Sequence, residues 1–267
     1  TATKNTAIGQ QALNENTTGA YNVAVGSNSL DANTTGTENV AVGHASLGAV
    51  TDSTANTAVG HNSGASITTG DSNTFFGHQA GDATTTASNN TGVGKDALGV
   101  NTTGTLNTAV GANALEANTT ASHNTGIGNN ALGATTTGDE NTAIGSSALL
   151  LNTTGQNNVA IGREALRANT TASNITAVGF NSLLANTTGA SNVAVGTNSL
   201  LTITTASFNV AVGHNALRTS NASRNVGVGN DAGRSITDGT QNLALGDDAM
   251  YNVTTGNSNV AVGHDSL

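Results

Sequence analysis

Asn22-Val23-Ala24-Val25-Gly26 is the stretch that decides the fold, because variants of it return throughout the chain. Sixteen copies follow one another at intervals of 17 residues, with a single interval of 16 residues. The copies begin at Asn5, Asn22, Asn39, Asn56, Asn73, Asn90, Asn107, Asn124, Asn141, Asn158, Ile175, Asn192, Asn209, Asn225, Asn242 and Asn259. A short fixed period indicates a solenoid in which each repeat forms one coil. We therefore expect residues 1–267 to form a single continuous all-β solenoid, a β-roll of about sixteen coils.

The composition suits a narrow solenoid. Of the 267 residues, 36% are hydrophobic and 2% aromatic, and the chain has 34 glycines and no proline. Small aliphatic side chains fill only a thin core, whereas glycine and asparagine suit coils that are closed by tight turns. The lack of proline leaves the backbone N–H groups free to pair between coils. Disorder is disfavoured because the valines and leucines stay in register through all the copies.

Charge and residue usage exclude several partners and sites. The net charge is −9 with only seven basic residues, which argues against a nucleic-acid surface. Cysteine is absent, so disulfides and thiolate sites are excluded, and this fits an extracellular protein. No apolar run approaches the roughly 18 residues of a membrane span, and the N-terminal residues do not resemble a signal peptide. We expect no nucleic-acid partner and no membrane span.

The first segment of each coil has the periodicity of a strand. Val23 and Val25 alternate with Ala24, and Gly26 provides the backbone freedom of a corner. Two later segments follow, so we expect two or three short strands in each coil. We expect the valines to point inward and the alanine to lie where another surface comes close.

Equivalent residues in successive coils form columns through the stack. The Ala24 column contains only Ala or Gly except for Phe75, and Gly92 follows Phe75 in the next coil. We expect this glycine to make room for the ring. The Leu30 column contains Gly at three places, and Ile67 and Ile236 replace the usual Asn three residues after two of them. We expect these isoleucines to refill the lost volume.

Two columns of asparagine, of the Asn22 and Asn33 types, predict amide ladders. At the strand spacing of about 4.8 Å, each amide can bond to its equivalent above and below. The glycine that closes each copy predicts a corner. The structural residues selected on these grounds are Asn22, Gly26, Asn39, Gly43, Asn141, Gly145, Asn192 and Gly196.

The phrase N-T-A-I-G-x-x-A-L-x-x-N-T-T-G, found from Asn141 to Gly155, resembles the stalk repeats of phage tail fibres. The first half of each coil is similar to the YadA-type heads of trimeric autotransporter adhesins. The resemblance covers essentially the whole chain and implies a parallel homotrimer packed through its aliphatic strands. The period is longer than in typical adhesin heads, and no chaperone domain, neck or anchor accompanies the repeat. We expect a fragment or a processed part of a longer fibre.

Few residues suggest chemistry. His44, His61 and His78 follow the corner glycine in three successive coils and are weak candidates for a metal site. Residues of many kinds, most of them polar, fill the rest of that column, which favours a solvated surface, and we expect no metal or cofactor. The nine-residue calcium repeat and a G-x-S-x-G nucleophile phrase are both absent, so we do not expect an enzyme.

The sequence therefore predicts a structural shaft or head segment of a trimeric fibre. It would lie outside a cell or on a virion and contact a host-surface glycan or protein. One alternative is a self-associating extracellular filament subunit. A second is an ice-binding solenoid, in which one row formed by Thr34 or Thr35 would lie beside an asparagine row.

Overall fold

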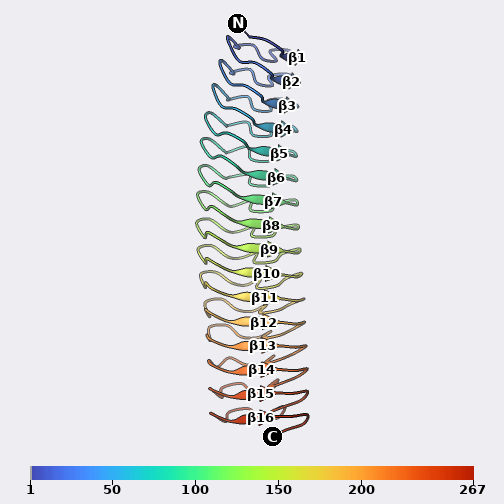
Figure 1. Cartoon of the computed structure of the whole chain (residues 1–267), viewed down its shortest axis with the longest axis vertical. Coiled ribbons are helices and arrows are strands. Elements are labelled where there is room, and N and C mark those ends of the chain that lie inside the picture. Colours follow the sequence, from blue (N-terminus) through green and yellow to red (C-terminus); the bar gives the residue numbers. More distant parts are fainter. Residues whose placement is uncertain (1) are drawn as a thin grey trace. The chain divides into compact units, whose positions relative to one another are not determined.

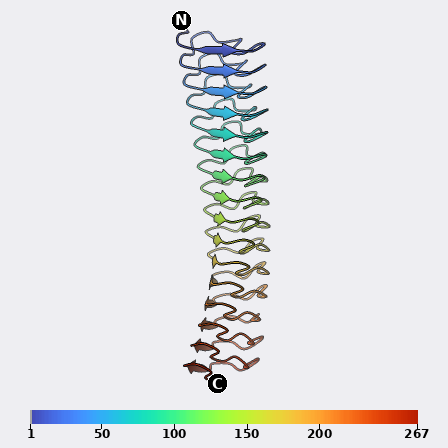
Figure 2. The same ribbon diagram turned by 90° about the vertical axis from the view of Figure 1, so that its right-hand side faces the viewer.

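A computed structural model describes residues 2–267, so the first residue of the predicted solenoid lies outside the described part. The described chain is an all-β parallel solenoid with a repeat of about 17 residues, as predicted. It divides into two compact units: unit 1 ends at Thr137, and unit 2 runs from Gly138 to Leu267. Within each unit, every coil contributes one strand, and the rest of the coil is made of turns and loops (Figures 1 and 2).

All the described strands have three residues. Unit 1 contains β1 (Thr6–Ile8), β2 (Val23–Val25), β3 (Val40–Val42), β4 (Thr57–Val59), β5 (Thr74–Phe76), β6 (Thr91–Val93), β7 (Thr108–Val110) and β8 (Thr125–Ile127). Unit 2 contains β9 (Thr142–Ile144), β10 (Val159–Ile161), β11 (Thr176–Val178), β12 (Val193–Val195), β13 (Val210–Val212), β14 (Val226–Val228), β15 (Leu243–Leu245) and β16 (Val260–Val262).

Each strand pairs in parallel with the next strand in its unit. Val23 lies opposite Val40, and Val25 lies opposite Val42, so residues 17 apart are neighbours. The coil that lacks one residue keeps this register, because Val210 lies opposite Val226. The deletion is therefore absorbed in the turns between β13 and β14, outside the paired strands.

The prediction of two or three strands per coil is wrong, because only one strand forms. Asn28, Leu30 and Glu38 have φ angles of 58°, 49° and 61°, and such left-handed residues cannot continue a strand. Backbone pairing between coils nevertheless continues outside the strands. The N–H of Thr34, for example, donates to the carbonyl of Thr51 over 2.8 Å.

The orientation predicted for the strand is also wrong. Ala24 is fully buried, whereas Val23 and Val25 are half-buried and face outward. The reason is the width of the core. A Cβ atom placed on Gly126, which belongs to the alanine column, would lie 3.4 Å from Cγ of Leu115, so this column faces the leucine column. The leucines fill the interior and leave space for little more than a methyl group.

The core substitutions confirm the predicted exchange of volume. A Cβ atom on Gly92 would lie 2.9 Å from Cδ1 of the buried Phe75 ring. A Cβ atom on Gly64 would lie 3.2 Å from Cδ1 of Ile67. Ile236 is equally buried and lies beside Gly233 in the same way. Where one column has a glycine, a larger side chain from another column thus fills the space.

Candidate functional site

The Asn22 column forms a ladder, but its main bonds go to the backbone. The Asn22 amide donates to the carbonyl of Gly36 over 2.8 Å, and its Oδ1 accepts the N–H of Asn39 over 2.9 Å. Asn39 is buried and repeats the pattern in the next coil. In unit 2, Asn141 accepts in the same way from the next coil, and so does Asn192. The buried amides therefore tie each strand to the following coil, which is a structural role.

The Asn33 column forms true amide ladders, which are interrupted. Asn33 donates to Oδ1 of Asn16 over 3.0 Å, and Asn118 donates to Oδ1 of Asn101 over 2.8 Å. Where the next coil has no asparagine in this column, the last amide oxygen has no partner. This is so for Asn33, Asn118 and Asn186, which precede Val50, Thr135 and Ile203.

The predicted corner glycines lie where two coils touch. Gly26 and Gly43 have φ angles of 134° and 133°, a region that is unfavourable for other residues. A Cβ atom on either one would overlap the carbonyl of the glycine in the next coil. Gly145 and Gly196 have the same geometry, with φ angles of 135° and 132°. These glycines are part of the scaffold and carry no chemistry.

The three candidate histidines are stacked on the surface of unit 1. The ring centroids of His44 and His61 are 5.1 Å apart, and those of His61 and His78 are 5.3 Å apart. All three side chains are exposed. Two nitrogens on one zinc ion must both lie about 2.0–2.1 Å from the metal, so rings at this spacing cannot share it without rotating. Across residues 2–267, no group of three or more His, Cys, Asp or Glu side chains could hold a metal ion.

The hydroxyl of Thr34, which belongs to a threonine column considered for ice binding, is already hydrogen-bonded within the chain. Thr34 is half-buried, and its hydroxyl donates to the carbonyl of Thr51 over 2.9 Å. Thr35 is exposed, but Asn33 is fully buried. The asparagine row predicted beside the threonine row is therefore inside the coil, because its amides are needed for the ladder.

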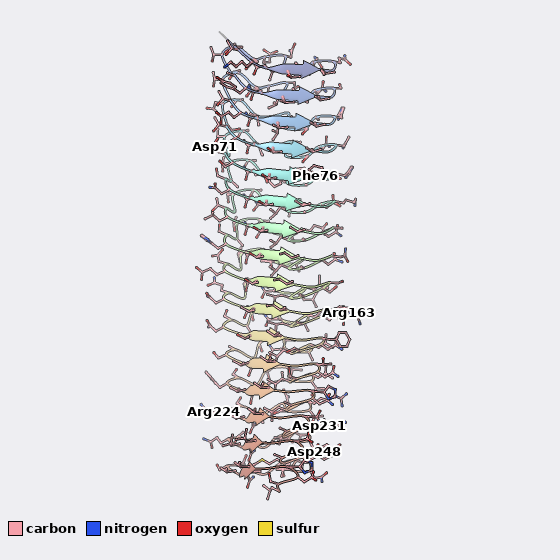
Figure 3. The ribbon with its side chains drawn as sticks, turned by 45° about the vertical axis from the view of Figure 1, so that its right-hand side comes forward. Asp71, Phe76, Arg163, Arg224, Asp231 and Asp248 are labelled. Carbon is pink, nitrogen blue, oxygen red and sulfur yellow. The ribbon has the colours of Figure 1, made fainter. Side chains whose placement is uncertain are left out.

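The most distinctive surface in each unit is the strand face, defined as the first and last residues of each strand. These residues are Thr, Val, Ile, Leu or Phe, so the strand face carries no charge. Phe76 is 55% exposed and points away from the ribbon in Figure 3, and Leu245 is 42% exposed. In a parallel stack, these side chains form two continuous columns. An acidic protein thus presents one uncharged, largely apolar face.

A search of protein-family models and of curated proteins finds no match to this chain. Two further observations concern the described residues as a whole. The described residues enclose no pocket. None of them forms a helix with the length and apolar character needed to cross a bilayer.

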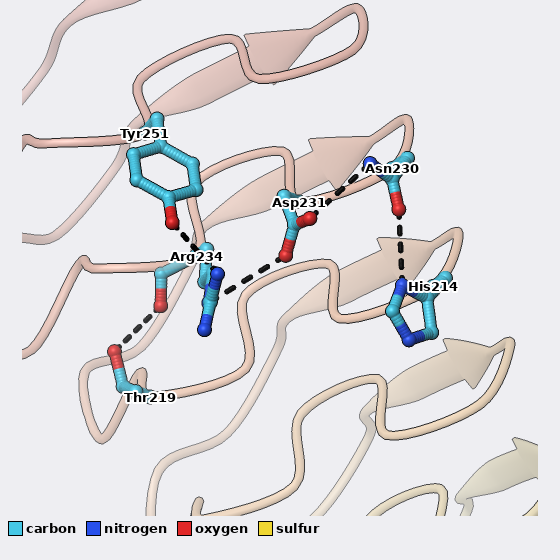
Figure 4. A network of polar contacts seen from close by, with 6 residues as sticks. All are labelled: His214, Thr219, Asn230, Asp231, Arg234 and Tyr251. Carbon is cyan, nitrogen blue, oxygen red and sulfur yellow. Dashed lines mark hydrogen bonds and ion pairs between the residues drawn. The ribbon is translucent and has the colours of Figure 1, made fainter.

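A polar network occupies the surface of unit 2 (Figure 4). Arg234 donates from Nη1 to the hydroxyl of Tyr251 over 2.7 Å and lies 3.5 Å from the Asp231 carboxylate. Asn230 donates to Asp231 over 3.2 Å and lies 3.0 Å from Nδ1 of His214. The network links neighbouring coils, and its members are engaged with one another.

Burial and neighbouring groups raise the pKa of three ionisable side chains. Partial burial, together with the nearby carboxylate of Asp247, raises the pKa of Asp248. The hydrogen bond from Lys95 to Asp96 raises the pKa of the lysine. Burial raises the pKa of Asp82, which has no cationic partner within ion-pair distance among the described residues.

Sequence reasoning selected the ladders and the corners, but it placed the valines of the strand face inside the coil. One signal could have identified this face. The Val25 column accepts residues as large as Phe76 and Leu245, whereas the Ala24 column accepts a large residue only beside a glycine. Tolerance of size indicates exposure, and restriction of size indicates burial.

Proposed function

We propose that the chain is a structural segment of a surface fibre, such as a phage tail fibre or a surface adhesin, built from three parallel copies. The observation that carries this proposal is the uncharged strand face, which has no partner within a single chain. Packing three strand faces around one axis removes their apolar columns from water without burying a charge. Monomeric proteins rarely leave long contiguous apolar surfaces exposed.

The stacked coils suit a load-bearing segment. Internal coils are held by backbone hydrogen bonds to the coils on both sides, and buried asparagines add side-chain bonds at most strands. Opening one coil in the middle therefore breaks contacts with two neighbours.

The proposed contact with a host lies on the exposed turns. Residues such as His44 and Glu38 face solvent, and their columns vary from coil to coil. In a trimer, each column occurs three times, so weak glycan or protein contacts would combine into firm attachment. The location of the fibre outside a cell or on a virion belongs to the same proposal.

The mass of the purified protein in dilute solution tests the trimer. Sedimentation equilibrium is expected to give three times the chain mass of 26.1 kDa. A monodisperse monomer at micromolar concentration would rule out the proposal. Long polymers with no trimeric intermediate would favour the self-associating filament instead.

A pair of variants in one coil locates the contact. Val110→Lys places a charge on the strand face and is expected to give monomers, because three ammonium groups would meet at the axis. Thr120→Lys adds the same charge at an exposed turn and is expected to leave the trimer intact. Equal circular dichroism spectra would show that both variants fold. If Val110→Lys stays trimeric, the strand face is not the interface.

A further inference from the structure

A second surface differs between the two units. The lateral column is defined as the tenth residue of each repeat, counted from the residue that opens it. In unit 1 it contains Asn14, Asp31, Gly48, Ala65, Asp82, Gly99, Glu116 and Gly133. In unit 2 it contains Leu150, Arg167, Leu184, Leu201, Arg218, Arg234 and Tyr251. One unit therefore presents acidic and small residues, and the other presents arginines and large apolar residues.

Four charged residues of the lateral column form no ion pair with the described residues of their own chain. Asp31 and Asp82 are half-buried and form no ion pair with any described residue. Arg167 is exposed and forms none either. Nε of Arg218 is buried without a hydrogen-bond partner. A buried donor without a partner is costly, so a carboxylate from outside the chain would improve its environment.

The spacing of these residues matches between the units. Asp31 and Asp82 are 51 residues apart, as are Arg167 and Arg218, and 51 residues are three repeats of 17. Two small residues lie between the aspartates in the lateral column, and two leucines lie between the arginines. The two patterns are therefore complementary in charge and in volume over four successive coils.

We propose that two copies of this chain pair antiparallel, with the lateral column of unit 1 in one copy packed against the lateral column of unit 2 in the other. The resulting pairs are Asp31 with Arg218, Gly48 with Leu201, Ala65 with Leu184, Asp82 with Arg167, and Gly99 with Leu150. Each of the three leucines then lies opposite Gly or Ala, of which Gly48 and Ala65 are half-buried and Gly99 is buried in the single chain. Each unpaired arginine lies opposite an aspartate. A parallel arrangement satisfies the four central pairs but places Leu150 against the polar Asn14.

The contact would select its partner by charge. Guanidinium and carboxylate groups form bidentate pairs, and burying the leucines beside glycine and alanine excludes water from them. The same surfaces in the wrong combination, unit 1 against unit 1, would bring aspartates together, which disfavours that pairing. Burial already raises the pKa of Asp82, consistent with a carboxylate that lacks its cation in the single chain.

The lateral column shares no residue with the strand face, so the pairing can occur between trimers or between single chains. It rests on the proposed function in one respect: if the chain belongs to a surface fibre, antiparallel pairing joins fibres that project from facing surfaces. The ligand is then a second copy of the protein, and the activity is homophilic adhesion.

A charge-reversal substitution at Arg167 tests the pairing, because this side chain is exposed and its replacement should not disturb the fold. The wild-type particle is expected to associate as concentration rises in low salt, a single chain to a dimer and a trimer, which carries three lateral columns, to two or more trimers. Added salt should weaken the association. Arg167→Asp is expected to weaken it about tenfold or more, because an aspartate would then face Asp82. Sedimentation velocity over a concentration series measures both effects.

Two double variants distinguish antiparallel from parallel pairing of the two copies. Arg167→Asp with Asp82→Arg restores the antiparallel pair and is expected to restore the association. Arg167→Asp with Asp31→Arg restores only the parallel register and is expected to stay weak. Rescue by the second variant alone, or no effect of Arg167→Asp, would overturn the proposal. A monomer that doubles to a dimer would keep the pairing and reject the trimer, whereas a trimer that never associates further would do the reverse.

Discussion

The ring of Phe75 occupies the space that a side chain on Gly81 would need. A Cβ atom on Gly81 would overlap three carbons of the ring, and Phe75 is fully buried. In most other coils, an alanine stands in place of Phe75 and a leucine in place of Gly81. The coil that contains β5 therefore fills its core from the strand, whereas its neighbours fill theirs from the following turn.

This exchange predicts a strong coupling between the two positions. Phe75→Ala alone is expected to lower the stability by about 3–5 kcal/mol, because it leaves a cavity that the glycine cannot fill. Adding Gly81→Leu should recover most of the loss. Leu98 has a φ angle of 55° and Gly81 one of 61°, so leucine suits this backbone. Gly81→Leu alone should be destabilising, and additive losses in the urea denaturation of all three variants would contradict the coupling.

The interrupted asparagine ladder predicts a stabilising substitution. Thr135 is fully buried, its hydroxyl has no partner, and it follows Asn118, whose Oδ1 also has none. Thr135→Asn would donate its amide to Asn118 and is expected to raise the stability by about 1 kcal/mol.

Thr135→Val is the matched control for the ladder, because it removes the unpaired hydroxyl without adding a donor. Thermal unfolding should show a larger gain for asparagine than for valine. An equal gain in both variants would mean that only the loss of the hydroxyl matters and that the ladder contributes nothing.

The sequence predicts the period, the parallel register and the buried asparagines, since each follows from repetition. It does not predict which side of the strand faces inward. Alternation places Ala24 and Val25 on opposite sides, and the valine side was predicted to face inward although the alanine side is the buried one. Leu30 fills most of the core, and only the packing of the coil shows that the space left beside the strand fits little more than a methyl group.

The sequence also predicts the strands and the surface columns only in part. Asn28 and Leu30 adopt left-handed backbone angles that ordinary residues rarely take, so two of the expected strands are turns. The histidine column was correctly placed along one line, with His44 stacked on His61. The charge difference of the lateral column was visible in the sequence, but the unpaired Nε of Arg218 required coordinates.

The corner glycines predict a sharp contrast between two alanine substitutions. Gly43 has a φ angle of 133°, and a Cβ atom there would overlap the carbonyl of Gly60. Gly43→Ala is therefore expected to cost about 3 kcal/mol or more, from backbone strain together with the clash.

Gly99→Ala provides the comparison. The nearest atom to its added Cβ would be the Asp96 carbonyl oxygen at 3.2 Å, and Ala65 already occupies the equivalent place in another coil. We expect a change below about 1 kcal/mol. Hydrogen exchange should show local opening around the corner only in Gly43→Ala. Similar protection in both variants would show that the corners adapt.

Stability should depend on pH through Asp82. Burial raises its folded-state pKa above the ordinary value of 3.8, so the folded chain holds this proton more tightly than the unfolded chain does. The fold therefore favours the protonated carboxyl group over the ionised one, and this stabilising contribution is lost as the pH rises from 3.8 through the raised pKa. Asp82→Asn is expected to raise the thermal midpoint at pH 7 and to leave it unchanged at pH 3. Asp52→Asn, at an exposed turn, controls for the loss of one negative charge. An equal gain at both pH values, or the same gain in the control, would show that burial of Asp82 is not the cause.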